Sequence, residues 1–151
     1  NIINPYIIDS NVLDLFAGTG SLGIECLSRG ASSAIFVDVS KESINIVKSN
    51  IKKARVENES TILNLDFKNA IDRLKIQNKK FDIIFMDPPY YKNMFIDALS
   101  SIDEADLLCD DGIIVVEHDT KDKFVDKIGR LEKTRDKKYG NTTLTFYKLE
   151  E

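Results

Sequence analysis

Short apolar runs that alternate with helical stretches constrain the fold of this chain more than any other feature. Such runs are too short for helices and are typical of strands, and they occur at 12–16, 34–37, 61–65, 81–86 and 113–116. Continuously apolar strands are buried on both faces, as in a parallel sheet covered by helices. The alternation therefore predicts an open, doubly wound α/β sheet.

The helices between these strands show recognisable ends and apolar faces. A helix is expected at 21–29, because Gly30 suits the position that follows a helix. Ser40 is a suitable N-cap for the next helix. A further helix is expected from about 94 to 108. The apolar faces of the second and third helices are predicted to contain Ile44, Val47, Ile51 and Ala54, and Ala70, Ile71 and Leu74.

The end of the chain has a different pattern. The segments 131–138 and 142–149 flank Tyr139-Gly140-Asn141, and the second segment alternates between Leu144 and Phe146 on one face and more polar residues on the other. This pattern predicts an antiparallel hairpin at the sheet edge. With 151 residues, a single domain is expected, with a seven-stranded, mostly parallel sheet, a C-terminal antiparallel hairpin and helices on both faces.

A glycine-rich loop follows the first predicted strand. Gly18, Gly20 and Gly23 match the pattern G-x-G-x-x-G, which forms a tight turn at a helix N-terminus where a nucleotide-type ligand can approach the backbone. Asp38 ends the second strand, where a carboxylate can accept hydrogen bonds from ribose hydroxyls. Asp66 follows the third strand and could contact an adenine amino group, cap the next helix, or do both.

Asp14 distinguishes this loop from that of a dinucleotide-binding dehydrogenase, which is the competing interpretation. It lies in the first strand, four residues before Gly18. A diphosphate would be repelled by this extra carboxylate, whereas the ammonium group of a bound amino acid would be attracted.

Two of the three prolines are adjacent, in Asp87-Pro88-Pro89-Tyr90, directly after the fourth predicted strand. Consecutive prolines make a stiff turn, here at the strand end where open α/β sheets bind ligands. The Asp87 carboxylate and the Pro88 carbonyl are two fixed acceptors that suit an NH₂ group, and Tyr90 offers a face on which a base can stack.

Composition excludes several other classes of protein. A single histidine, His118, and two cysteines without C-x-x-C spacing give no basis for a metal site, and reduced cysteines fit a cytoplasmic protein. No apolar run is long enough to span a membrane. The net charge of −4 argues against a protein coated in positive charge, but residues 121–148 carry 9 Lys/Arg against 4 Asp/Glu and could contact a polyanion.

These motifs together resemble the S-adenosylmethionine-dependent amino-methyltransferases. The segment from Asp14 to Glu25, continued through Leu27-Ser28-Arg29-Gly30-Ala31, looks like the RsmD family of 16S ribosomal RNA (guanine-N2)-methyltransferases, and Lys138-Tyr139-Gly140 with Phe146-Tyr147-Lys148-Leu149 is similar to its closing hairpin. The resemblance implies a Rossmann-like class I methyltransferase fold and S-adenosyl-L-methionine as cofactor. It also implies 16S rRNA or a small ribosomal subunit particle as partner.

The resemblance assigns roles to individual residues. It implies that the target guanine amine is held by Asp87, Pro88, Pro89 and Tyr90. It implies that the cofactor is held by Asp14, Ala17, Gly18, Thr19, Gly20, Asp38, Val39, Asp66 and Phe67. The family has a basic segment upstream of the first strand, with Arg-Pro-Thr and Arg-Glu motifs, so the full-length protein is expected to have an N-terminal segment that precedes residue 1.

Two other functions share much of this pattern. DNA methyltransferases that modify adenine N6 or cytosine N4 use the same Asp-Pro-Pro-Tyr arrangement to hold an amine. A non-catalytic S-adenosylmethionine-binding module would keep the same fold. His118, at the end of the fifth strand, is expected to be a rim residue rather than a general base.

Overall fold

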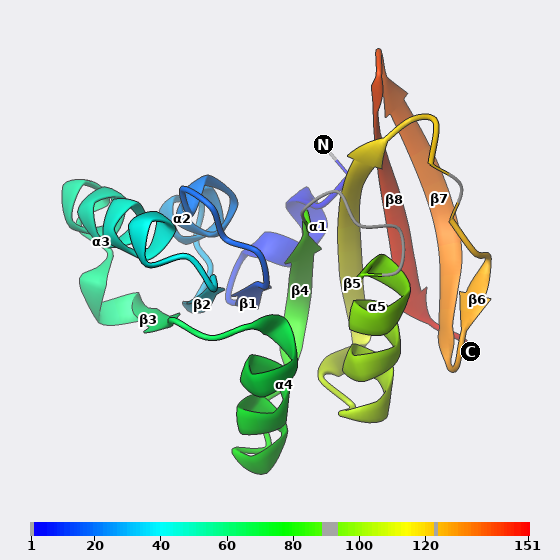
Figure 1. The fold of residues 1–151 in the computed structure, drawn as a ribbon, viewed down its shortest axis with the longest axis horizontal. Helices are drawn as coiled ribbons and strands as arrows, with labels where there is room; N and C mark the ends of the chain where they lie inside the picture. The colour runs from blue at the N-terminus through cyan, green and yellow to red at the C-terminus, as the bar shows by residue number, and fades with distance from the viewer. Residues whose placement is uncertain (1, 89–93, 123) are drawn as a thin grey trace.

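The computed structural model describes residues 2–88, 94–122 and 124–151. Eight strands form one sheet in the order β3-β2-β1-β4-β5-β8-β7-β6 (Figure 1). Strands β1 to β5 pair in parallel, and the remaining pairings are antiparallel. The strands are β1 (Asn11–Asp14), β2 (Ser33–Val37), β3 (Ser60–Leu63), β4 (Phe81–Met86), β5 (Leu108–Asp119), β6 (Lys127–Ile128), β7 (Leu131–Tyr139) and β8 (Thr142–Leu149).

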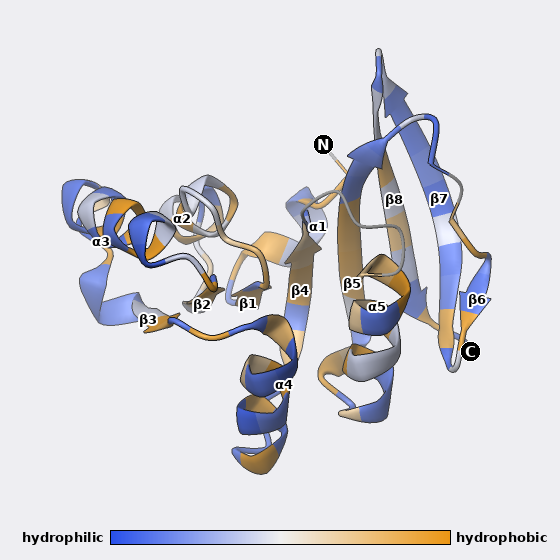
Figure 2. Cartoon of the chain, viewed as in Figure 1, coloured by the Kyte–Doolittle hydropathy of each residue, from blue (hydrophilic) through white to orange (hydrophobic). Residues whose placement is uncertain are grey.

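Helices cover both faces of the sheet and create two apolar cores. One core joins β-strand residues to α1, α2 and α3, and the other joins them to α4 and α5. Figure 2 shows the strands of the parallel part as mainly hydrophobic and the exposed helix surfaces as mainly hydrophilic. The helices are α1 (Asn4–Ile7), α2 (Ser21–Ser28), α3 (Lys41–Ala54), α4 (Phe67–Ile76) and α5 (Met94–Glu104), with a short 3₁₀ turn η1 (Glu57–Glu59). The predicted α/β class with a parallel sheet is confirmed.

The helix signals in the sequence are mostly confirmed. The Ser40 side chain accepts a hydrogen bond from the Ser43 backbone N–H and caps α3. Gly30 follows the end of α2 with a φ of 109°. The apolar faces predicted for α3 and α4 are buried at Ile44, Val47 and Ile51 and at Ala70, Ile71 and Leu74.

The C-terminal hairpin is also confirmed. Strands β7 and β8 pair antiparallel around Gly140, whose φ is 60°. Leu144 and Phe146 face the core beneath α1 to α3, whereas Tyr147 faces the core beneath α4 and α5.

Two predicted features differ in the structure. The predicted helix at 94–108 ends at Glu104, because the chain turns back through a left-handed Asp106 (φ 54°). Leu108 then starts β5 and pairs with Phe81. The prediction of seven strands is also wrong, because Lys127 and Ile128 pair with β7 and add a two-residue eighth strand at the edge.

The packing of α2 on β2 requires a glycine. A Cβ added at Gly23 would lie 2.5 Å from Phe36 Cε1 and 2.9 Å from Cζ, and Phe36 is fully buried. Since the Phe36 ring is enclosed in a close-packed core, the third glycine of the loop motif allows α2 to approach the sheet this closely.

We therefore predict that Gly23→Ala destabilises the protein by about 2–3 kcal/mol through overpacking, despite the higher helix propensity of alanine. Denaturant unfolding followed by circular dichroism would measure the loss. Ser28→Ala, at the exposed end of the same helix, is the matched control and should change stability by less than about 0.5 kcal/mol. Equal stability of Gly23→Ala and the wild-type protein would contradict the packing argument.

Candidate active site

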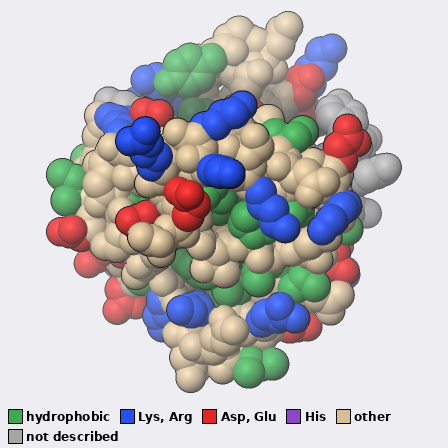
Figure 3. Space-filling view, turned by 90° about the vertical axis from the view of Figure 1, so that its left-hand side faces the viewer, with side chains coloured by type: hydrophobic (Ala, Val, Ile, Leu, Met, Phe, Trp, Pro, Cys, Tyr) green, Lys and Arg blue, Asp and Glu red, His purple; other side chains and the backbone are tan. Residues whose placement is uncertain are grey.

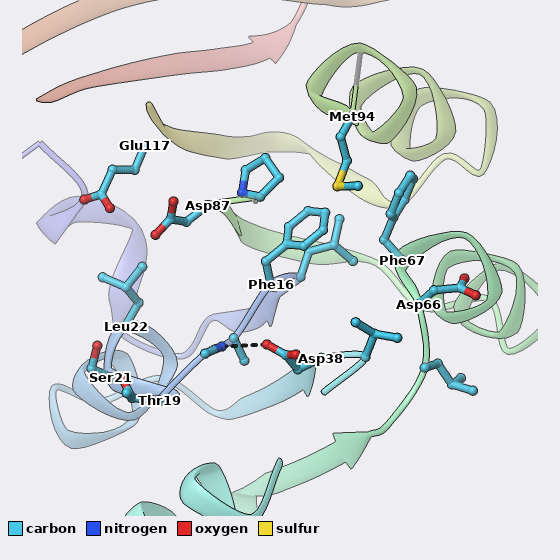
Figure 4. A pocket seen from close by; sticks show the side chains of 16 residues that line it. Phe16, Thr19, Ser21, Leu22, Asp38, Asp66, Phe67, Asp87, Met94 and Glu117 are labelled. Carbon is cyan, nitrogen blue, oxygen red and sulfur yellow. Dashed lines mark hydrogen bonds between the residues drawn. The ribbon is translucent and has the colours of Figure 1, made fainter. Parts of the chain in front are cut away.

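A cavity of 690 Å³ opens at the carboxyl ends of the parallel strands. Its volume falls within the range of about 300–1,000 Å³ that small-molecule sites occupy. The side chains lie in the loops that follow β1 to β4, at the starts of α2, α4 and α5, and in β5, and Figure 4 shows them arranged around the cavity. The cavity is lined by Leu15, Phe16, Ala17, Gly18, Thr19, Ser21, Leu22, Asp38, Val39, Leu65, Asp66, Phe67, Asp87, Pro88, Met94 and Glu117.

Most of the predicted site residues meet in this cavity. The cavity lining includes nine residues of the predicted set: Ala17, Gly18, Thr19, Asp38, Val39, Asp66, Phe67, Asp87 and Pro88. Asp14 and Gly20 do not line it. Pro89 and Tyr90 lie outside the described residues.

Asp38 ties the glycine loop to the end of β2. One of its carboxylate oxygens accepts a hydrogen bond from the Gly18 N–H at 2.9 Å, and the other accepts one from the Ser40 N–H at 2.9 Å (Figure 4). Gly18 adopts a φ of 58°, a conformation that disfavours other residues. Each Asp38 oxygen keeps a second lone pair, so the carboxylate can brace the loop and still accept a ligand hydroxyl.

Gly20 lies behind the glycine loop and supports its turn. It is the N-cap of α2 with a φ of 79°, and its N–H donates to the Ala17 carbonyl at 2.8 Å. A Cβ there would lie 3.2 Å from Val47 Cγ1. Its backbone therefore shapes the turn from beneath the cavity.

Asp14 lies beneath the start of α2 and is 2% exposed. Its carboxylate accepts a long hydrogen bond, 3.4 Å, from the Gly23 N–H. Burial raises the pKa of Asp14 to about 7, the Gly23 hydrogen bond opposes this shift, and the charges of Asp87 and Asp38 add to it. A cation brought to this end of the cavity would favour the ionised form.

The opposite wall of the cavity is apolar and aromatic. The Phe16 and Phe67 rings lie 5.7 Å apart at 49°, and Val39 is 71% exposed at the cavity edge. Asp66 caps α4: its two oxygens accept hydrogen bonds from the Asn69 N–H at 2.8 Å and the Asn69 side-chain amide at 2.9 Å. Figure 4 shows its carboxylate turned toward α4, so the capping alternative for Asp66 is confirmed.

Asp87 and Glu117 form a carboxyl pair at the remaining side of the cavity. Met86 of β4 pairs with Val116 of β5, so the next residues, Asp87 and Glu117, stand side by side. Burial, the charge of Glu117 and a hydrogen bond to the Glu117 side chain together raise the pKa of Asp87 to about 6. Only the protonated form of Asp87 can donate this hydrogen bond, and a bound amine that donates to Asp87 would favour its ionised form.

The sequence prediction missed Glu117 and, in the apolar wall, Phe16, whereas Val39 and Phe67 of that wall were predicted. Glu117 directly follows the apolar run 113–116, but it still lies within β5, which continues to Asp119. The usable signal was its place at the carboxyl end of the fifth apolar run, the same rule that identified Asp38 and Asp87. His118, expected at the rim, is instead buried on the opposite face, where its Nε2 lies 2.6 Å from Thr145 Oγ1.

The fold and the cavity define a class I S-adenosylmethionine-dependent methyltransferase, and comparisons with known proteins agree. The model of the family described as "Conserved hypothetical protein 95" matches residues 1–148. The chain therefore belongs to this family, the RsmD family.

Individual relatives cover most of the chain. It is 40% identical over 148 residues, 98% of its length and 80% of the relative's, to "Putative rRNA methyltransferase YlbH" of Bacillus subtilis. It is 38% identical over 126 residues, 82% of its length and 63% of the relative's, to "Ribosomal RNA small subunit methyltransferase D" of Haemophilus influenzae. A solved structure of a conserved hypothetical protein of Streptococcus pyogenes superposes with a TM-score of 0.88 at 35% identity, covering 99% of this chain and 93% of that one.

The raised pKa of Asp14 predicts a pH-dependent stability. The folded state holds its proton up to about pH 7, whereas an unfolded aspartate releases it near pH 4. Stability is therefore lost as the pH rises from 4 to 7 and stays reduced above 7. Asp14→Asn should raise the melting temperature at pH 8 by about 3 °C for each kcal/mol recovered, and should change it little at pH 4.

Thermal unfolding at both pH values would measure this difference, with the exposed Asp110→Asn as control. The same change in melting temperature at pH 4 and pH 8 would show that the Asp14 charge is not the cause.

Proposed function

We propose that this protein transfers the methyl group of S-adenosyl-L-methionine to the exocyclic N2 amine of a guanine in 16S ribosomal RNA. The observation that carries the proposal is one cavity with two chemically different ends. The glycine loop and Asp38 lie at one end, and Asp87 with Pro88 lies at the other. Membership of a family with relatives named for rRNA methylation supports an RNA substrate.

The donors and acceptors of the cavity fit the cofactor. The Asp38 carboxylate would accept hydrogen bonds from the ribose hydroxyls, and the amides of the glycine loop would hold the amino-acid portion, with Asp14 balancing its ammonium charge from beneath. Phe16, Phe67 and Val39 offer apolar surface for the adenine. S-adenosylmethionine would supply a methyl group on a positively charged sulfonium, an electrophile that an amine can attack in line.

Asp87 and Pro88 would prepare the attacking amine. The N2 lone pair of guanine is delocalised into the ring, and two acceptors that each take one N–H favour a pyramidal nitrogen whose lone pair points at the methyl group. The carbon–nitrogen bond forms as the carbon–sulfur bond breaks. Asp87 stabilises the positive charge that develops on nitrogen, and the proton then released passes to Asp87 or to water.

The C-terminal hairpin offers a basic surface beside this end of the cavity. Arg135 pairs with Phe146, and Lys137 pairs with Leu144. Leu144 in turn pairs with Glu117, so all of these side chains lie on one face of the sheet. Figure 3 views the opposite end of the molecule, around α3, where basic and acidic side chains are interspersed. We therefore place the RNA backbone across the hairpin, where Lys and Arg can bind phosphates.

The location of the enzyme and its domain organisation belong to the same proposal. No helix among the described residues is long and apolar enough to cross a membrane. We propose one cytoplasmic catalytic domain over residues 1–151 that acts on 16S rRNA or on a small-subunit particle. A basic segment that precedes residue 1 would help to bind the RNA.

Methyl transfer to alternative substrates tests the proposal. The complete gene product would be given labelled S-adenosylmethionine with undermethylated small-subunit particles, free 16S rRNA or duplex DNA. Transfer to either RNA substrate supports the proposal. Transfer to DNA alone would favour a DNA methyltransferase, and cofactor binding without transfer to any substrate would favour a non-catalytic module.

Asp87→Ala should lower the rate of methyl transfer by at least about 100-fold, because it removes the acceptor at the developing charge. Calorimetry should show cofactor affinity within a few-fold of the wild-type value, since Asp38 and the glycine loop are unchanged. Asp110→Ala, at the exposed opposite end of β5, is the control and should retain full activity. Turnover at the wild-type rate in Asp87→Ala would exclude the role given to Asp87.

A further inference from the structure

The carboxylate of Glu117 lies where it can contact the same substrate base as Asp87. The pairing of Met86 with Val116 brings the two acidic residues to adjacent positions on β4 and β5, and both line the 690 Å³ cavity. Figure 4 shows the two carboxyl groups near each other on one side of the cavity, above Leu22. A substrate amine held by Asp87 would therefore bring its neighbouring ring atom to Glu117.

The surroundings of Glu117 leave its carboxylate available for a substrate donor. Among residues 2–88, 94–122 and 124–151, no Lys, Arg or His forms an ion pair with it. Its side chain shares a hydrogen bond with Asp87, which contributes to the raised pKa of Asp87. Glu117 also borders a second, largely apolar hollow of 260 Å³ beside Leu144 and Phe146, on the face that carries Arg135 and Lys137.

The Watson–Crick edges of the bases differ in what they would present to this pair. Guanine has the N1–H donor next to its N2 amine. Adenine and cytosine have an unprotonated ring nitrogen, an acceptor, next to their amines. Two neighbouring carboxyl groups therefore match the donor edge of guanine, whereas an acceptor nitrogen facing Glu117 would leave two lone pairs opposed and unpaired.

We propose that Glu117 is a specificity-determining residue that accepts a hydrogen bond from guanine N1–H while Asp87 and the Pro88 carbonyl hold the N2 amine. The proposal rests on the proposed function and extends it, because it explains why a strand-end motif shared with adenine and cytosine methyltransferases selects guanine. The Glu117 side chain is exposed in the free protein, but a bound base would cover it, and enzymes reject analogues most strongly where a covered polar group would lose its partner. Binding of guanine would release the proton shared by Asp87 and Glu117 to solvent, and each carboxylate would then accept one hydrogen bond from the base.

A paired change in enzyme and base tests this role. The RNA substrate would contain either guanosine or 2-aminopurine riboside at the target position. 2-Aminopurine keeps the N2 amine but presents N1 as an acceptor. Wild-type enzyme should prefer guanosine by at least about 100-fold in kcat/KM. Glu117→Gln, whose amide can donate to N1, should narrow or reverse this preference by at least about 10-fold.

Two further variants separate specificity from structure. Glu117→Ala should lose activity on guanosine without gaining activity on 2-aminopurine, since it has no donor. Glu104→Gln, exposed at the end of α5, should keep the wild-type preference. Cofactor affinity should be unchanged in Glu117→Gln, because the side chain binds no cofactor group, and the melting temperature should not fall, because the substitution removes a charge that faces Asp87.

The outcomes distinguish this inference from the function on which it rests. If wild-type enzyme methylates guanosine but the base preference of Glu117→Gln stays within about 3-fold of the wild-type preference, the assignment of Glu117 is wrong and the proposed function stands. If wild-type enzyme methylates an adenine or cytosine amine instead, or methylates no RNA, the proposed function and the role of Glu117 fail together.

Discussion

Parallel pairing of β2, β1, β4 and β5 is the constraint on which the site depends. Because these strands run in the same direction, their carboxyl ends meet at one edge of the sheet. Asp38, Asp87 and Glu117 are far apart in the sequence, yet this pairing gathers them around one cavity, with Asp14 buried behind it. The apolar cores on both faces stabilise the pairing, so the position of every acidic group follows from burial of residues that perform no chemistry.

The gathering of carboxyl groups lowers the stability of the fold and prepares it for a ligand. Asp14 and Asp87 both have raised pKa values because burial and neighbouring acidic groups disfavour their charged forms. Positive charge at one end of the cavity and base N–H donors at the other would relieve this repulsion. The same interactions that reduce stability are therefore available to favour binding. Gly23 packs against Phe36. This packing keeps the glycine loop close to Asp14, so that a positively charged ligand group held by the loop can interact with the Asp14 carboxylate.

The sequence was sufficient for the features encoded locally. The apolar runs predicted the parallel sheet, and the Ser40 cap and the glycine turn predicted where helices begin. Because parallel strands end at one edge of the sheet, the positions of Asp38 and Asp87 after their strands placed both in one cavity. It was insufficient where distant segments decide the outcome. Glu117 lies in a strand that extends past its apolar run because β8, from the end of the chain, pairs with it. Asp14 was expected at the cavity but lies behind it, because α2 packs over its carboxylate.

Identification of the methylated nucleoside tests the central claim most directly. Small-subunit rRNA treated with the enzyme and labelled S-adenosylmethionine would be digested to nucleosides and analysed by mass spectrometry against authentic standards. The arrangement of Asp87, Pro88 and Glu117 predicts N2-methylguanosine as the labelled product. Label in N6-methyladenosine or N4-methylcytidine would contradict the account, because the acidic pair would then face an acceptor nitrogen.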